Sequence, residues 1–302
     1  MMKQKEIGKN MEERAEKLNE ILKRQNQEFR VRYCRNWKNN IAYHGYMLHS
    51  NNRNVKPVIY MNCFNCNSDW YKNTDLEVVE FLSKKYKELS TEASVSFEYL
   101  KNKKFILDRI RPRLVGSEKN IDELLKAKKA FVELDNLDML ITFYIYLGEN
   151  EEGEANIPVT NDLLEEAEGI TLEEAKSYAI SNMEKLACVN SMGEVLNELI
   201  GMDYSTEAEL MLICSNESRC NGAASILCPS VQDKLKDRLG NNVILLPSSV
   251  HEMIAISTKN NIYEVDALQA MVQEINEDQV ALEDQLTNSV YMLRDGLLER
   301  IS

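Results

Sequence analysis

The chain has 302 residues, of which 44 % are hydrophobic and 28 % charged, and a formal net charge of −13. This composition is typical of a folded globular protein and excludes a chain that is disordered throughout. An acidic protein repels phosphate backbones, so we expect no general nucleic-acid binding. The basic run at 101–113 is expected to be a solvated helix end followed by an ordinary strand.

No apolar run approaches the roughly 20 residues that span a bilayer, so no membrane contact is expected. The charged N-terminus lacks the apolar core of a signal peptide. The seven cysteines are an odd number and fit reduced thiols better than a disulfide framework. These features predict a cytoplasmic protein.

Hydrophobic periodicity predicts alternating helices and strands in the first half of the chain. Apolar residues at helical spacing predict helices at 11–29, 76–89, 95–106 and 121–129. Alternating or continuous apolar runs predict strands at 29–33, 41–48, 57–64, 109–114 and 139–147. Asn39 and Asn40 mark a turn between the first two strands, which form a meander with the third. The last strand has an unbroken apolar run, which indicates burial on both faces.

A charged, glycine-containing segment at 149–154 predicts a boundary between an N-terminal lobe, 1–150, and a C-terminal lobe, 151–302. The two lobes are also compatible with one continuous domain. A strand at 155–160 is expected to pair back on the preceding strand. The helices that follow are expected at 161–168, 171–186 and 191–200, with Asn161 and Thr171 as N-caps of the first two.

The unit at 209–256 is the part around which the chain is organised. It is expected to contain strands at 210–215, 223–228, 243–246 and 250–257 and a helix at 230–239, followed by helices at 265–276 and 277–298. The fold class is therefore α+β, with a mixed, mostly antiparallel sheet and flanking helices. A C-terminal hairpin–helix–hairpin unit and a helical tail complete the expected fold.

The densest run of reactive side chains lies within this unit. Ser249, His251 and Glu252 are candidate catalytic residues, because a hydrolase needs a nucleophile, a base and an orienting carboxylate. On one strand Ser249 and His251 stand roughly 7 Å apart, and Glu252 points to the opposite face, which disfavours a triad. The structural interpretation is a tight turn whose serines bond the backbone. The candidate ligand-binding residues are Ser248, Ser249, His251, Glu252, Asn221 and Asp138.

Other motifs carry weaker signals. His251 and Glu252 could form a metal site with His44, His49 or Asp138. Three histidines are few, however, and no H-x-x-x-H or H-E-x-x-H spacing occurs, so neither a metal nor a cofactor is expected. Cys63 and Cys66 have the C-x-x-C spacing without a second ligand pair, and incidental thiols are the favoured interpretation over a redox or metal role. Residues 221–224, N-G-A-A, are interpreted as a hairpin turn rather than a phosphate loop.

Several motifs together resemble one uncharacterised family. They are N-N at 39–40, H-G at 44–45, P-V-I-Y at 57–60, R-L-V at 113–115, E-K-N at 118–120, L-D at 137–138, N-G-A-A at 221–224, L-P-S-S-V-H-E at 246–252 and V-Q-E-I-N at 272–276. The pattern is similar to a domain-of-unknown-function family of anaerobic Gram-positive gut bacteria and covers nearly the whole chain. Family members commonly have an aromatic-rich segment after Tyr60, where this chain has Cys63 to Cys66. The resemblance implies a bacterial protein and assigns no activity.

Two classes of function remain open, and a third is weaker. The first is a non-enzymatic binding or interaction protein that acts on a protein partner, because no convergent catalytic set is visible. The second is a small-molecule hydrolase or ligand-binding enzyme centred on Ser249, His251 and Glu252. The third is an acidic inhibitor of nucleic-acid machinery. Partner, substrate and oligomeric state do not follow from the sequence.

Overall fold

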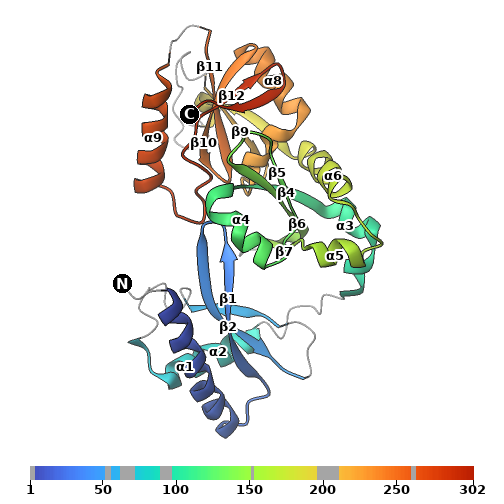
Figure 1. Ribbon diagram of the computed structural model, residues 1–302. Helices are drawn as coiled ribbons and strands as arrows, with labels where there is room; N and C mark the ends of the chain where they lie inside the picture. Colours follow the sequence, from blue (N-terminus) through green and yellow to red (C-terminus); the bar gives the residue numbers. More distant parts are fainter. Residues whose placement is uncertain are drawn as a thin grey trace. The chain divides into compact units, whose positions relative to one another are not determined.

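The computed structural model describes residues 4–51, 56–61, 72–88, 97–150, 153–195, 211–259 and 263–302. The chain folds into two compact units, Met1–Ser96 and Phe97–Ser302. Three antiparallel sheets with flanking helices make the fold α+β, which confirms the predicted class (Figure 1). No helix in the described ranges is long and apolar enough to span a bilayer.

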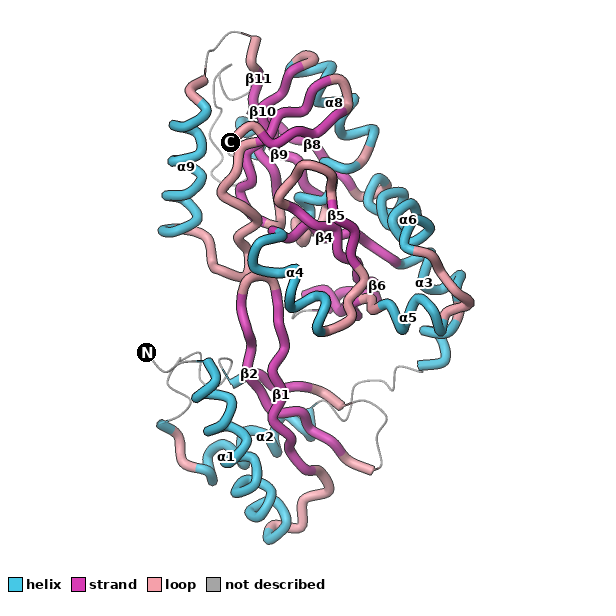
Figure 2. The backbone as a smooth tube through the Cα atoms, in the orientation of Figure 1, coloured by secondary structure: helices cyan, strands magenta, loops and turns pink. Residues whose placement is uncertain are grey.

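In the part of the first unit that the structure describes, α-helices lie beside an antiparallel sheet (Figure 2). The elements of this unit are α1 (Gln4–Arg24), β1 (Arg30–Lys38), β2 (Ile41–His49), β3 (Val58–Tyr60) and α2 (Asp75–Glu88). The sheet order β1-β2-β3 confirms the predicted meander. The turn at Asn39 and Asn40 is also confirmed, and Asn40 has φ 60°, a left-handed conformation that asparagine tolerates.

Both helices of the first unit bury one face against its sheet. Leu18 and Leu22 of α1 and Leu82 of α2 are fully buried in the same apolar cluster as Phe29 and Tyr46. Arg14 Nε on α1 donates to Asp75 Oδ1 on α2 at 2.7 Å, and this ion pair ties the two helices together.

The second unit contains a four-stranded and a six-stranded sheet. Its first elements are η3 (Phe97–Lys101), α3 (Lys103–Arg109), β4 (Ile110–Gly116), α4 (Ser117–Lys126), β5 (Phe131–Glu133), β6 (Met139–Asn150), β7 (Gly153–Pro158), α5 (Asn161–Glu166) and α6 (Leu172–Glu184). β6 is the central strand of the four-stranded sheet and pairs with β4, β5 and β7. Residues 139–145 are all buried, as the unbroken apolar run predicts.

The remaining elements form the six-stranded sheet and its helices. They are β8 (Ala187–Ser191), β9 (Met211–Asn216), η5 (Gly222–Leu227), α8 (Pro229–Leu239), β10 (Asn242–Ser249), β11 (Glu252–Ser257), α9 (Val265–Asp278), β12 (Tyr291–Arg294) and β13 (Leu297–Arg300). The strand order is β13-β12-β10-β11-β9-β8. Along β10, Val243 and Leu245 belong to the main core that includes α8, whereas Ile244 and Leu246 belong to the cluster under α9 (Figure 1).

One apolar core joins the two sheets of the second unit. Ile141 and Phe143 from β6 share this core with Leu245 and Met253 from the six-stranded sheet. Residues around the predicted boundary at 150 form the β6–β7 hairpin, and the chain divides into its two compact units between Ser96 and Phe97. A charged, glycine-containing segment is typical both of a hairpin turn and of a linker between lobes, so its local composition does not distinguish the two.

Two predicted elements of the C-terminal half are wrong. Residues 223–228, predicted as a strand after a hairpin turn, instead belong to the 3₁₀ helix η5 and its C-cap Cys228, so the central unit is strand–3₁₀–helix–hairpin. Residues 277–298, predicted as a helical tail, end α9 and then form the β12–β13 hairpin. Pairing of β12 with β10 overrides the local helical pattern, which is a tertiary effect.

Smaller differences concern helix ends. Thr171 is the N-cap of α6, as predicted, and its hydroxyl accepts from the Glu174 N–H at 3.1 Å. For α5 the cap is Thr160 rather than Asn161, because Thr160 Oγ1 accepts the Leu163 N–H at 3.2 Å. Part of the predicted helix at 191–200 lies outside the described residues. Cys63 and Cys66 also lie outside them.

A buried asparagine links α6 to the start of the four-stranded sheet and gives a test of this fold. Asn182 Nδ2 donates to the carbonyls of Leu107 at 2.8 Å and Ile110 at 3.0 Å. We expect Asn182→Ala to lower the free energy of unfolding by about 1–3 kcal/mol, because both carbonyls lose their side-chain donor. Chemical denaturation measures this change.

The matched control for this test is Ser181→Ala on the exposed face of the same helix. We expect this control to change the free energy of unfolding by less than about 0.5 kcal/mol. Equal effects of the two substitutions would contradict the junction between α6 and β4.

Candidate functional site

His251 lies in the tight turn that connects β10 to β11. The strand register shifts between Pro247 and Ser249, so the chain bulges immediately before the turn. Ser249 Oγ accepts the backbone N–H of His251 at 3.0 Å. This bond matches the turn-stabilising role considered for the serine. The His251 side chain remains 35 % exposed, so solvent reaches one side of the ring.

Both nitrogens of the His251 ring have partners from other segments. Nδ1 accepts the backbone N–H of Asn221 at 3.1 Å. In the neutral ring Nε2 therefore carries the hydrogen and donates it to Asp284 Oδ1, also at 3.1 Å. The carboxylate that pairs with His251 is thus Asp284, which follows α9 in the chain. We call His251, Asn221 and Asp284 the histidine junction.

Backbone contacts surround the histidine junction. Asn221 has φ 57° and aims its N–H at the ring from the residue before η5. Ser215 Oγ donates to the His251 carbonyl at 2.8 Å, and the Val250 N–H donates to the Asp284 carbonyl at 2.7 Å. A Cβ at Gly222 would lie 2.6 Å from the His251 carbonyl oxygen, so only glycine fits this approach.

The other predicted side chains do not complete a triad. Ser248 Oγ donates to Glu252 Oε1 at 3.0 Å, and both side chains are half-buried. Among the described residues, no hydrogen bond joins a serine hydroxyl to the imidazole of His251. A nucleophile needs its base within hydrogen-bond reach, and here both ring nitrogens have other partners. The arrangement suits a structural or binding role better than nucleophilic catalysis.

Asp138, predicted as a ligand-binding residue, belongs to a different cluster. Its carboxylate accepts from Ser289 Oγ at 2.7 Å and Tyr291 Oη at 2.5 Å, and Arg300 Nη1 lies 3.8 Å away. Burial and then the charge of Asp138 raise the pKa of Tyr291. Asp138 thus anchors the C-terminal hairpin to the four-stranded sheet.

A second polar cluster lies beside Asn221 and was not among the predicted site residues. It consists of Arg111 and Arg113 on β4, Tyr144 on β6 and Glu154 on β7, and we call it the arginine cluster. Arg111 Nη1 lies 3.4 Å from Glu154 Oε1, and the Glu154 side chain is only 4 % exposed. The Arg113 guanidinium lies over the Tyr144 ring, 5.5 Å from its centroid.

Burial controls the electrostatics of the arginine cluster. Burial first and the charge of Glu154 second raise the pKa of Tyr144 to about 12. The Asn221 side chain acts in the opposite direction on this pKa, although it does not reach hydrogen-bond geometry with the hydroxyl. Burial and then Glu154 also raise the pKa of the Cys220 thiol. Asn221 therefore links the histidine junction to the arginine cluster.

One feature of the sequence could have predicted the arginine cluster. Arg111 and Arg113 are two residues apart on a predicted strand, so they share one face. Their partner strand is the most apolar in the chain, and Arg111 pairs directly with Tyr144. Two arginines on the face of a buried strand indicate a paired or ligand-binding role rather than solvation.

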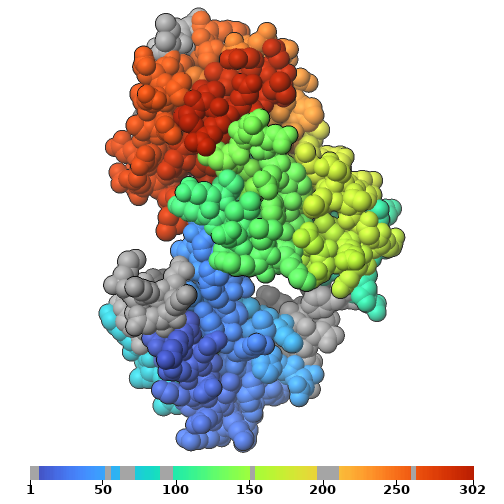
Figure 3. Space-filling view, viewed as in Figure 1, coloured from blue at the N-terminus to red at the C-terminus, as the bar shows by residue number. Residues whose placement is uncertain are grey.

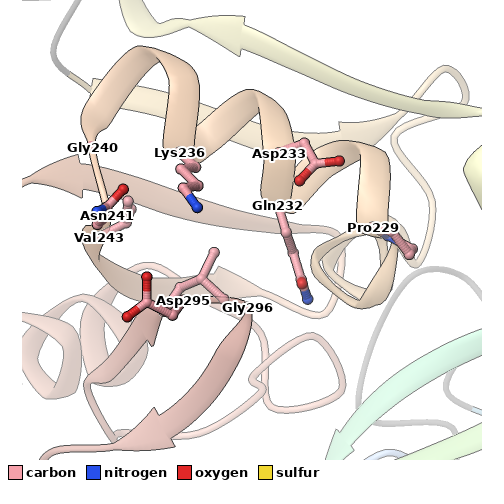
Figure 4. Close-up of a pocket in the computed structure, with 10 residues that line it drawn as sticks. Pro229, Gln232, Asp233, Lys236, Gly240, Asn241, Val243, Asp295 and Gly296 are labelled. Atoms are coloured by element: carbon pink, nitrogen blue, oxygen red, sulfur yellow. The ribbon is translucent and has the colours of Figure 1, made fainter.

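A separate pocket of about 160 Å³ lies beside α8. Lys236 on α8 and Asp295 in the β12–β13 turn face this pocket from opposite sides (Figure 4). Gln232 extends into the same space, and its amide already donates to the Ile226 carbonyl at 2.9 Å. None of the predicted site residues lines this pocket.

Two further kinds of site considered from the sequence are a metal site and a basic patch. Within the described ranges, no group of three His, Cys, Asp or Glu side chains is placed to hold a metal ion. In the basic run, Lys103 Nζ pairs with Glu174 Oε2 at 2.8 Å, and Asp108 and Glu168 line the same surface hollow. Acidic neighbours therefore interrupt the basic run.

The family model that matches this sequence covers residues 9–294 and is described as a family of unknown function, DUF5688. The chain belongs to this family. Membership over nearly the whole chain confirms the expected kind of family, whereas its taxonomic range and motif stay predictions. No curated protein matches this DUF5688 chain, and no solved structure matches it.

The histidine junction gives a test with two substitutions at one position. His251→Ala removes the acceptor for the Asn221 N–H, and Asn221 is only 2 % exposed. We expect this change to lower the free energy of unfolding by about 1–3 kcal/mol. His251→Asn is expected to lose less, because an asparagine Oδ1 can take the place of Nδ1. Chemical denaturation of both variants measures the difference.

Glu252→Ala is the neighbouring control, because the hydrogen bond of the Glu252 side chain among the described residues is to Ser248, at the half-buried rim of the turn. We expect it to change stability by less than about 0.5 kcal/mol. If the alanine and asparagine variants at 251 were as stable as the native chain, the junction would have no structural role.

Proposed function

We propose that this DUF5688 protein is a non-enzymatic binding protein in the bacterial cytoplasm. Its partner is a protein that presents basic residues around apolar side chains. The observation that carries this proposal is the outer surface of α9, which combines exposed large apolar side chains with acidic ones. The occupied nitrogens of His251 support a non-enzymatic role as well.

The apolar part of this surface is displayed at helical spacing. Met271 and Ile275 are four residues apart on α9, and they are 42 % and 41 % exposed. Leu282 follows the helix and is 50 % exposed. Side chains four residues apart lie on one helix face, so Met271 and Ile275 form a continuous apolar stripe. Figure 3 shows that α9 contributes to the surface of the second unit.

The segment of the chain that carries this stripe has charge of one sign. Residues 260–293 contain no lysine or arginine, and their seven acidic residues are Glu264, Asp266, Glu274, Glu277, Asp278, Glu283 and Asp284. A surface of one sign attracts a partner of the opposite sign and speeds its association. The stripe and its acidic surroundings therefore fit a basic, amphipathic segment of a partner protein.

Two alternatives remain as proposals of lower rank. An enzyme centred on His251 is favoured by the exposed ring and its Asp284 partner, but the ring would first have to release Asn221 or Asp284. An acidic inhibitor of nucleic-acid machinery would use the same α9 surface against a basic nucleic-acid-binding protein.

A lysine- and leucine-rich amphipathic helical peptide is the probe for the α9 surface. Fluorescence anisotropy should show binding near 0.05 M salt that weakens at 0.5 M, because salt screens exposed charges. Ile275→Asp is expected to raise the Kd about tenfold or more, because the stripe loses an apolar contact.

Leu125→Asp is the matched control, because Leu125 is 59 % exposed on α4, outside the proposed surface. It adds the same charge as Ile275→Asp and should leave the Kd within about twofold. Equal weakening by both substitutions, or no binding by the native chain, would refute the proposal. Thermal unfolding of each variant confirms that the fold is retained.

A further inference from the structure

Three buried polar atoms of the arginine cluster have no hydrogen-bond partner among the described residues. They are Arg113 Nε, Tyr144 Oη and Glu154 Oε2. Buried polar atoms in folded proteins are nearly always paired, because burial without a partner is costly. Three such atoms in one cluster are therefore candidates for hydrogen bonds to a further molecule.

These atoms share one environment within the second unit. The Arg113 guanidinium lies 5.5 Å from the centroid of the Tyr144 ring, and Arg111, the strand partner of Tyr144, lies 3.4 Å from Glu154. Glu154 and Arg113 also both act on the pKa of Tyr144. Tyr144 is 3 % exposed, whereas Arg113 and Cys220 are half-buried. The cluster therefore has a buried floor and a rim that reaches solvent.

The existing contacts of Glu154 leave one of its oxygens for a ligand. Oε1 accepts from Ser218 Oγ at 2.8 Å and lies 3.4 Å from Arg111 Nη1. The Cys220 thiol, a weak donor, interacts with this carboxylate and its pKa is raised by it, although the thiol does not reach hydrogen-bond geometry with Oε2. Oε2 has no partner of its own in the described ranges, so it requires a donor.

Positive charge exceeds negative charge around the arginine cluster. Arg111 and Arg113 carry two positive charges against the single carboxylate of Glu154. Lys129 is close enough that burial and then the charge of Arg113 lower the pKa of its amine. In a chain with a net charge of −13, this local excess favours an anion.

We propose that the arginine cluster binds a small oxyanion that carries its own hydrogen-bond donor, of which monohydrogen phosphate is the simplest example. Arg113 Nε and the Tyr144 hydroxyl donate to the oxygens of the anion. Glu154 Oε2 accepts the hydrogen of the anion. This site is separate from the α9 surface and does not depend on the function proposed for it.

The carboxylate acceptor determines which oxyanions fit. Sulfate has nearly the same size and charge as monohydrogen phosphate, but at neutral pH it has no hydrogen to donate. Glu154 Oε2 would therefore face a sulfate oxygen without a hydrogen bond, and two negative oxygens repel each other. The site is accordingly selective for phosphate over sulfate.

Isothermal titration calorimetry of the full chain with sodium phosphate and with sodium sulfate, at pH 7 and matched ionic strength, tests this proposal. We expect saturable phosphate binding and sulfate binding that is at least about tenfold weaker. Phosphate should also raise the Tm, because a ligand of the folded state stabilises it. Absence of phosphate binding, or equal affinity for both anions, would overturn the proposal.

Two variants separate the donor from the acceptor. Tyr144→Phe removes a hydroxyl that has no partner in the described structure, so the fold should be retained while phosphate affinity falls about tenfold. Glu154→Gln supplies an amide donor and should narrow or reverse the preference for phosphate over sulfate.

Tyr178→Phe is the matched control, because Tyr178 is 44 % exposed on α6. We expect it to bind phosphate with the affinity of the native chain. Unchanged phosphate affinity in Tyr144→Phe would overturn the site even if the Glu154→Gln variant failed to fold.

Discussion

The contact between Gly222 and the turn at His251 is the constraint on which the second unit depends. A side chain at position 222 would meet Ser215 Oγ at 2.3 Å, the His251 carbonyl at 2.6 Å and the Asn216 N–H nitrogen at 2.7 Å. Because glycine allows this approach, Asn221 can reach the imidazole and η5 can enter the core. The histidine junction thus holds η5, the β10–β11 turn and the segment after α9 in one place.

The second unit has an exposed acidic segment and a largely buried basic cluster. The segment from 260 to 293 has only acidic ionisable side chains apart from tyrosine, and it presents Met271 and Ile275 to solvent. The arginine cluster has the opposite sign and is largely buried. Exposed charge of one sign mainly guides association, whereas buried charge requires a close partner. The two features therefore support the two separate proposals, a basic protein partner for the first and a small anion for the second.

The polar residues at 248–252 are adjacent in the sequence but form hydrogen bonds with different partners. Ser248 and Glu252 bond each other, Ser249 bonds the backbone, and His251 bonds Asn221 and Asp284. Asp138, which was grouped with them, instead anchors Tyr291. Composition made these side chains resemble a hydrolytic set, but the turn and the strand ends direct Ser249, His251 and Glu252 to different partners, so adjacency did not assemble a triad.

The sequence by itself determined the α+β class, the three-stranded meander, the buried strand β6, and the turn role of Ser249. These features follow from local periodicity and turn chemistry, which act within a few residues. Only the tertiary structure decided that residues 223–227 belong to a 3₁₀ helix, that the C-terminus pairs as a hairpin, and that Asp284 meets His251. Those outcomes depend on contacts between segments far apart in the chain, such as β12 with β10, and local pattern carries no information about which distant segment will be the partner.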